Sequence, residues 1–115
     1  MDESTLESCT YRLLPGTDRD AFLAANEPVE RWLSAQPGYR GRQLTGDEDG
    51  AWHDLVWWSD RSAAEAAAVA FMEAPEAVEM NGMLDPGSLV FRHLRVVRTA
   101  WVGTPAADPD AATPA

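Results

Sequence analysis

Asp54 is the residue best placed for chemistry, since it is the only formal charge in the aromatic stretch of residues 50–59, which reads G-A-W-H-D-L-V-W-W-S. This composition is typical of a β-strand, in which alternate side chains share a face, so Asp54 is grouped with Trp52, Val56 and Trp58. A carboxylate among apolar groups loses hydration and becomes a stronger base, as the deprotonation of a phenol requires. The alternative is structural: Asp54 pairs with an arginine of another strand or lies near the sheet edge.

The two histidines are weaker candidates. His93 could act as a proton shuttle, because imidazole changes charge near neutral pH, or it could be a satisfied packing residue beside Phe91. His53 is adjacent to Asp54 in the strand and so points to the opposite face. We expect it to face the helices and to be structural. Two histidines on separate strands without a carboxylate cluster predict no metal site.

Other polar residues also leave two interpretations open. Four arginines on predicted outer strands could hold an anionic ligand, or they could be solvated rim charges or ion pairs between subunits; they are Arg40, Arg42, Arg92 and Arg95. Cys9 is the single cysteine, so it forms no intramolecular disulfide and is most simply a small buried hydrophobe.

The tryptophans are expected to belong to the core or the dimer interface first, and to form an aromatic cage for a ligand second.

Composition excludes several classes of function. The chain has 115 residues, enough for one domain, and a net charge of −10, which argues against nucleic acid or an anionic membrane as a partner. All nine basic residues are arginine, so Schiff-base chemistry and a P-loop are excluded. The start M-D-E-S-T resembles no secretion signal, and no apolar run is long enough to span a bilayer, so we expect a cytoplasmic protein.

Periodicity predicts the order β-α-β-β-α-β. One helix is expected to begin after Thr17 and to continue, with a kink, through Pro28; the other is expected to follow Ser59 or Asp60. Residues 98–102 are expected to extend the last strand or to pack against a partner through Trp101. The predicted strands cover 5–14, 39–45, 50–59 and 88–97, a short helical turn covers 76–81, and the chain divides into an arm (1–4), one domain (5–102) and a disordered tail (103–115).

This order predicts an α+β fold of the ferredoxin-like kind, with an antiparallel sheet. Two helices would cover one face of the sheet and leave the other bare. Both parities of the aromatic strand carry large apolar groups, so the bare face would be an apolar patch. We therefore expect a homodimer that packs sheet face to sheet face, a dimeric α/β-barrel.

Several short motifs resemble those of the antibiotic biosynthesis monooxygenase-like domains, members of the dimeric α/β-barrel superfamily. They are Y-R-L-L-P-G (11–16), Q-P-G-Y (36–39) and W-H-D-L-V-W-W-S-D (52–60) running into A-A-E-A-A (63–67), within a resemblance that covers residues 5–97. The resemblance implies that Trp58 matches a cavity tryptophan of the family's quinone-forming oxygenases. Asp54 stands where those enzymes have asparagine, and their following tyrosine is absent near Ala64.

The resemblance does not extend to the haem-degrading branch of the family. That branch needs an asparagine in the first strand and a histidine in the second helix, where this chain has Cys9 and about Ala68. We therefore expect no haem, and no other cofactor.

The sequence leaves two functions open. The first is a cofactor-independent monooxygenase for an apolar aromatic or polyketide-type substrate, in which Asp54 is the base and Tyr11 or His93 assists. The second is a non-catalytic small-molecule-binding or structural protein on the same scaffold. For the first, we expect Asp54, Trp58 and His93 to be catalytic, and the substrate to contact Trp52, Val56, Tyr11, Cys9 and Phe91.

Overall fold

The structure of the protein is a computed structural model, which describes residues 4–101. The predicted tail, 103–115, and residues 1–3 of the predicted arm lie outside this range. The strands are β1 (Thr5–Tyr11), β2 (Tyr39–Gly46), β3 (Trp52–Trp58) and β4 (Val90–Arg95), and the helices are α1 (Arg19–Ser34), α2 (Arg61–Phe71) and α3 (Val78–Asn81). The predicted order of strands and main helices is confirmed, with α3 as the expected short turn of helix.

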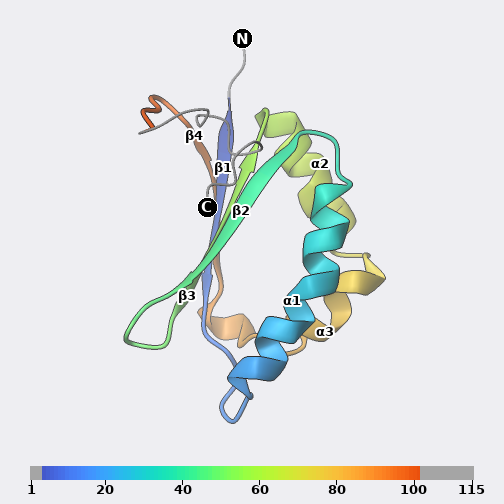
Figure 1. The fold of residues 1–115 in the computed structure, drawn as a ribbon, viewed down its shortest axis with the longest axis vertical. Coiled ribbons are helices and arrows are strands. Elements are labelled where there is room, and N and C mark those ends of the chain that lie inside the picture. The colour runs from blue at the N-terminus through green and yellow to red at the C-terminus, as the bar shows by residue number, and fades with distance from the viewer. Residues whose placement is uncertain (1–3, 102–115) are drawn as a thin grey trace.

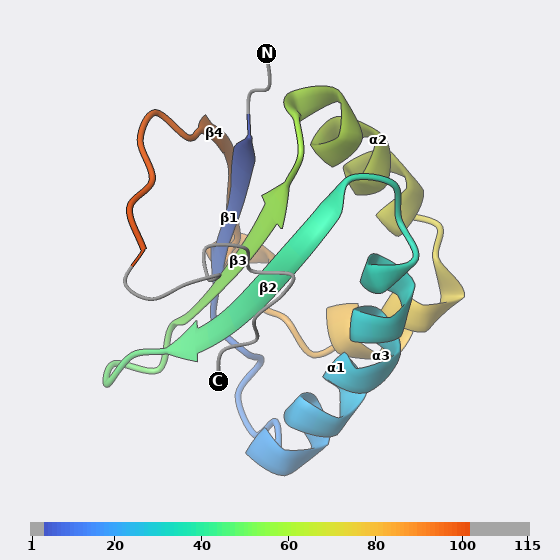
Figure 2. The same ribbon diagram turned by 45° about the horizontal axis from the view of Figure 1, so that its top comes forward.

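The four strands form one antiparallel sheet in the order β2-β3-β1-β4, which confirms the ferredoxin-like α+β fold. The aromatic strand β3 and β1 are therefore central. All of the helices lie on the same side of the sheet, as Figures 1 and 2 show from two directions. Within residues 4–101, the other face of the sheet carries no covering element.

The register decides which side chains lie under the helices. Cys9 pairs with Asp54 and Glu7 pairs with Val56, so these residues share the helix-facing side with Trp58. His53, in contrast, lies on the uncovered face, with a side chain that is 40% exposed and bonded to Asp47. The expectation that His53 faces the helices was wrong, because parity shows which residues share a face but not which face the helices cover.

The main helices begin at aspartate caps. Asp18, rather than the predicted Thr17, caps α1, because its side chain accepts a hydrogen bond of 2.9 Å from the backbone N–H of Ala21. The Thr17 hydroxyl instead donates to the carbonyl of Leu14. Asp60 caps α2, one of the two predicted positions. The first helix continues through Pro28 as expected.

Three strands are shorter than predicted, since β3 covers 52–58 rather than 50–59, and β1 and β4 also end early. β1 ends at Tyr11, since the backbone N–H of Arg12 already donates to the Ser88 hydroxyl and its carbonyl accepts from Asp85. β4 ends at Arg95 because its partner β1 begins at Thr5, leaving only the bond from Val96 N–H to the carbonyl of Ser4. Residues 96–101 therefore do not extend the strand, and Trp101 is 53% exposed.

The core lies between the helices and the covered face of the sheet. Phe22, Val29 and Leu33 of α1 pack there with Val56 and Trp58 of β3, and Ala64 and Ala67 are the buried residues of α2. Within residues 4–101, no helix has the length and apolar character needed to cross a membrane.

Candidate functional site

A cavity of about 510 Å³ lies between the covered face of the sheet and the helices. The helices supply most of an apolar wall, which includes Val29, Trp32, Leu33, Phe71 and Met80. The sheet supplies a mixed wall that includes Glu7, Cys9, Tyr11, Arg42, Asp54, Val56, Trp58 and Phe91. The arrangement suits a mainly apolar ligand that carries polar groups along one side.

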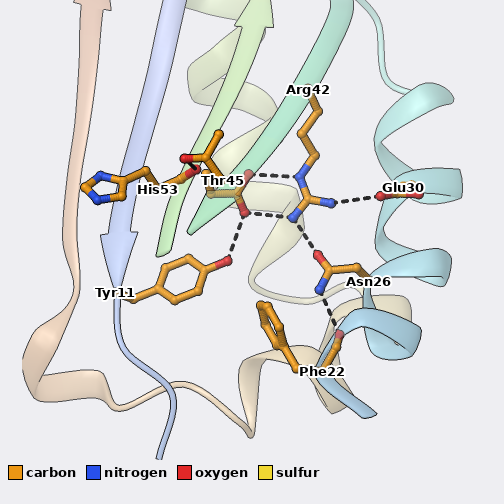
Figure 3. A network of polar contacts seen from close by, with 8 residues as sticks. Tyr11, Phe22, Asn26, Glu30, Arg42, Thr45 and His53 are labelled. Carbon is orange, nitrogen blue, oxygen red and sulfur yellow. Dashed lines mark hydrogen bonds and ion pairs between the residues drawn. The ribbon is translucent and has the colours of Figure 1, made fainter. Parts of the chain in front are cut away.

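Arg42 and Asp54 form a buried ion pair on the sheet wall. Arg42 Nε donates to Asp54 Oδ1 at 2.8 Å, and Nη2 donates to Oδ2 at 2.7 Å and to Asn26 Oδ1 at 2.6 Å. Asn26 in turn donates from Nδ2 to the carbonyl of Phe22 one turn earlier in α1. The network, drawn in Figure 3, ties the edge strand β2 to the central strand and to α1.

The guanidinium of Arg42 is enclosed by protein, and its side chain is only 4% exposed. Burial alone would lower the pKa of Arg42, but the hydrogen bonds and charge of Asp54 raise it. Arg42 Nη1 lies 3.5 Å from Glu30 Oε2 without a hydrogen bond to any of the described residues. Arg42 is therefore no rim charge, while Arg40, in a bulge of β2, is exposed.

These contacts match the structural alternative for Asp54, namely pairing with a strand arginine. Asp54 also accepts a hydrogen bond of 3.2 Å from the Tyr11 hydroxyl. Burial and the nearby charge of Asp54 raise the pKa of Tyr11, so its phenol stays protonated and serves as a donor. The carboxylate of Asp54 is thus held by Arg42 and Tyr11 rather than surrounded by apolar groups alone.

Glu7 provides a second carboxyl group in the cavity wall. Its Oε1 lies 3.2 Å from Nε2 of His93, directly across the β1–β4 pair, and the two side chains are 16% and 7% exposed. Burial raises the pKa of Glu7, and the hydrogen bond and charge of His93 oppose this effect. The Phe91 ring packs edge-on against the His93 ring, with centroids 4.9 Å apart.

The predicted aromatic residues divide between two places. Trp58 lines the cavity and is 1% exposed, and its indole N–H forms no hydrogen bond of normal geometry with the described residues. Trp52 does not line the cavity, because its ring packs against Phe22 at 4.9 Å and lies beneath the guanidinium of Arg19. The structure therefore separates Trp52 from the other predicted site residues.

Of the other predictions, Val56, Tyr11, Cys9 and Phe91 line the cavity together with Asp54 and Trp58. His93 contacts the cavity through Glu7. Sequence reasoning missed Glu7 as a site residue, although it lies on the same face of β1 as Cys9 and Tyr11. It also missed Asn26 and the apolar helix wall. Helical spacing shows which residues share a side of a helix, but not which residues of the sheet they contact. Residues 4–101 bring together no group of three metal-ligating side chains.

Comparison with known proteins found no matching family model and no matching curated protein. Solved structures do match. A "putative antibiotic biosynthesis monooxygenase" from Chloroflexus aurantiacus has a TM-score of 0.61 and 17% identity, over 87% of this chain and 99% of the other. SnoaB, a cofactor-independent oxygenase from Streptomyces nogalater, has a TM-score of 0.58 and 18% identity, over 91% and 99%.

A single-residue mutant of SnoaB also matches, with a TM-score of 0.61 and 16% identity, over 89% of this chain and 97% of the other. At this level of identity the likeness concerns the fold alone. The chain has the ferredoxin-like fold of antibiotic biosynthesis monooxygenase-type proteins, a fold shared with cofactor-independent oxygenases.

Proposed function

We propose that this protein is a cofactor-independent monooxygenase that oxidises an apolar aromatic or polyketide-type substrate in the cavity beneath its helices. The observation that carries the proposal is the cavity itself, about 510 Å³ with an apolar helix wall and ionisable groups on the sheet wall. This volume lies within the range of small-molecule sites. The shared fold of cofactor-independent oxygenases supports the same function.

The chemistry needs an acidic hydroxyl or C–H group and a base. Removal of a proton from a hydroxyanthrone-type ring leaves an electron-rich anion that reduces dioxygen directly. One oxygen atom is retained as a carbonyl and the other leaves as water, so a ring CH₂ and O₂ become C=O and H₂O. The protein binds the flat ring, excludes bulk water and removes the proton.

The polar network sets the orientation of the substrate. The wall beside Tyr11, Asp54 and Arg42 is fixed by hydrogen bonds between β1, β2 and β3. Trp32 and Phe71 pack against each other on the opposite wall, with ring centroids 5.5 Å apart. A planar substrate would lie between these walls with its oxygen atoms toward the sheet.

The test combines binding and turnover. Tryptophan fluorescence is titrated with alizarin, a hydroxyanthraquinone that is already oxidised, and oxygen uptake is then recorded with dithranol, a hydroxyanthrone. We expect saturable quenching, and oxygen uptake well above the spontaneous rate. The matched control is Ala67→Trp, which fills the cavity from α2 and should remove both signals.

A second function, non-catalytic binding of the same class of molecule, is favoured by one observation. The base expected from the sequence, Asp54, is engaged with Arg42 and Tyr11. Saturable quenching by alizarin without dithranol-dependent oxygen uptake would support binding and contradict the oxygenase proposal. Absence of quenching by both compounds would contradict both functions.

A further inference from the structure

The cavity wall carries two carboxyl groups in different surroundings, Asp54 and Glu7. Asp54 accepts hydrogen bonds on both of its oxygen atoms, two from a buried guanidinium and one from Tyr11. These three hydrogen bonds occupy both oxygen atoms of Asp54 and leave little room for a substrate hydroxyl. Glu7, in contrast, is held by His93 through Oε1.

A hydrogen-bond donor lies next to Glu7 on the same wall. Glu7 pairs with Val56 across the β1–β3 ladder, and Trp58 follows two residues later on the same face. The Trp58 indole N–H is near enough to lower the pKa of Glu7, yet it forms no hydrogen bond of normal geometry with the described residues. A buried donor whose protein contact falls short of a normal hydrogen bond is costly, and an acceptor atom of a ligand would complete its hydrogen bonding.

We propose that Glu7 is the general base of this site, that the Trp58 N–H binds the substrate oxygen, and that His93 positions the Glu7 carboxyl. This inference rests on the proposed function and names its substrate class, a phenolic or enolic hydroxyl on an apolar polycyclic ring. The substrate proton moves to Glu7 Oε2. The electron pair of the broken O–H bond stays on the substrate oxygen, which then accepts a hydrogen bond from Trp58.

The surroundings of Glu7 suit this role. The titratable groups that face it are His93 on β4, Asp54 on β3 and the thiol of Cys9 on its own strand. Burial dominates and raises its pKa, so the carboxylate is a stronger base than an exposed glutamate. The edge-on contact of Phe91 with the His93 ring restricts the imidazole, which in turn restricts Glu7.

The first test compares Glu7→Gln with Asp54→Asn, using dithranol and oxygen uptake across pH. We expect the wild type to lose activity at acidic pH, as Glu7 becomes protonated. Glu7→Gln should reduce kcat about 100-fold or more and remove this loss. Alizarin quenching should change less than about threefold, because the amide keeps the shape of the side chain. The loss of activity at acidic pH should persist in Asp54→Asn. Its disappearance there, with an unchanged profile in Glu7→Gln, would overturn the proposal.

Two further variants examine the supporting roles. His93→Gln removes the group that opposes the effect of burial, so the acidic loss should move to higher pH with KM nearly unchanged. Trp58→Phe keeps an aromatic ring but lacks the N–H, and kcat/KM should fall about tenfold or more. An unmoved pH profile in His93→Gln would overturn the positioning role, and an unchanged kcat/KM in Trp58→Phe would overturn the donor role. Circular dichroism checks that each variant is folded.

An anaerobic measurement separates this proposal from the oxygenase function. Dithranol is mixed with the protein without oxygen, and the visible absorption of its enolate is followed. Enolate formation by the wild type but not by Glu7→Gln supports Glu7 as the base even where no oxygen uptake is found. Equal enolate formation by both proteins overturns the role of Glu7 while leaving the oxygenase function standing. Absence of both signals in the wild type overturns both.

Discussion

The buried pair of Arg42 and Asp54 predicts a strongly asymmetric response to mutation. Asp54→Asn removes the countercharge of a guanidinium that is 4% exposed, leaving Glu30 as its partner at 3.5 Å. We expect the free energy of unfolding to fall by about 3–5 kcal/mol, as for other broken buried pairs. The double variant Arg42→Met with Asp54→Leu removes both charges and should cost less than Asp54→Asn alone. Urea denaturation measures both.

The matched control for this prediction is Asp47→Asn. Asp47 also pairs with a side chain on β3, but its partner His53 lies on the uncovered face and both side chains are about two-fifths exposed, at 41% and 40%. Solvent screens such a pair, so stability should hardly change. Equal losses from Asp54→Asn and Asp47→Asn would contradict the dominant role assigned to burial.

Cys9 should be an unusually unreactive thiol. Burial, followed by the charges of Asp54 and Glu7, raises the pKa of Cys9 to about 12. An ordinary cysteine has a pKa near 8.5, so the thiolate fraction at pH 8 falls on the order of 1000-fold. We expect iodoacetamide to label native protein more slowly by that factor, and tenfold faster for each pH unit up to about 10. Protein unfolded in urea is the control, and rapid labelling of native protein would contradict the prediction.

Single residues show where sequence reasoning stops. Parity correctly grouped Asp54 with Val56 and Trp58, because side-chain alternation is a property of one strand. The pairing with Arg42 depends on the β2–β3 register and on the bulge near Arg40, which no single-strand pattern contains. Glu7 was overlooked for a related reason, since its partner His93 lies 86 residues away.

At the scale of elements, the order of the helices and strands could be predicted from the sequence, but the residues at which the strands end could not. Aspartate caps and apolar spacing identify helices locally, so α1 and α2 begin within one or two residues of the expected positions. A strand end depends on its neighbour: β4 stops where β1 has no further residues to pair with it. Such information is absent from the sequence of β4 itself.

The turn between α1 and β2 makes an element-scale prediction through Gly38. This glycine has φ +84°, and a Cβ there would lie 2.6 Å from Ala63 Cβ and 2.8 Å from Ser59 Oγ. Gly16 is a matched control, because it has the same φ but nothing within 4 Å of its Cβ position. Thermal unfolding should show that Gly16→Ala costs about 1 kcal/mol through backbone strain.

Gly38→Ala should cost about 1–3 kcal/mol more than Gly16→Ala, because the start of α2 must also move away from β2. Ala63→Gly in the Gly38→Ala background removes the closer of the two clashing atoms and should recover part of this difference. Equal costs for the two glycine variants would show that backbone strain alone matters at both turns.

At the scale of the whole molecule, the cavity was the feature furthest from the sequence. Most of the ligand-contact residues expected on the strands line this cavity, but the opposite wall comes from α1, α2 and α3. Its volume depends on how far the helices stand from the sheet. The alanines and the apolar residues on one side of each helix show that the helices pack against the sheet. They do not show how large a cavity remains between the helices and the sheet.

The uncovered face of the sheet makes the last prediction, that the protein is a homodimer. Leu55 and Trp57 of β3 lie on this face beside Leu6 of β1, and Leu94 of β4 continues it with 42% exposure. Apolar side chains gathered on a bare face favour association, and the antiparallel sheet lets two copies pack face to face.

Sedimentation equilibrium at micromolar concentration should therefore give twice the mass of the chain. Trp57→Glu should weaken association on the order of 100-fold, because dimerisation would bury an unpaired carboxylate. Val69→Glu on α2 adds the same charge at a site that is 72% exposed on the helix side, so it should leave the dimer intact. A wild-type monomer, or equal dissociation of both variants, would contradict association through this face. Retained alizarin quenching in monomeric Trp57→Glu would further show that one protomer holds a complete cavity.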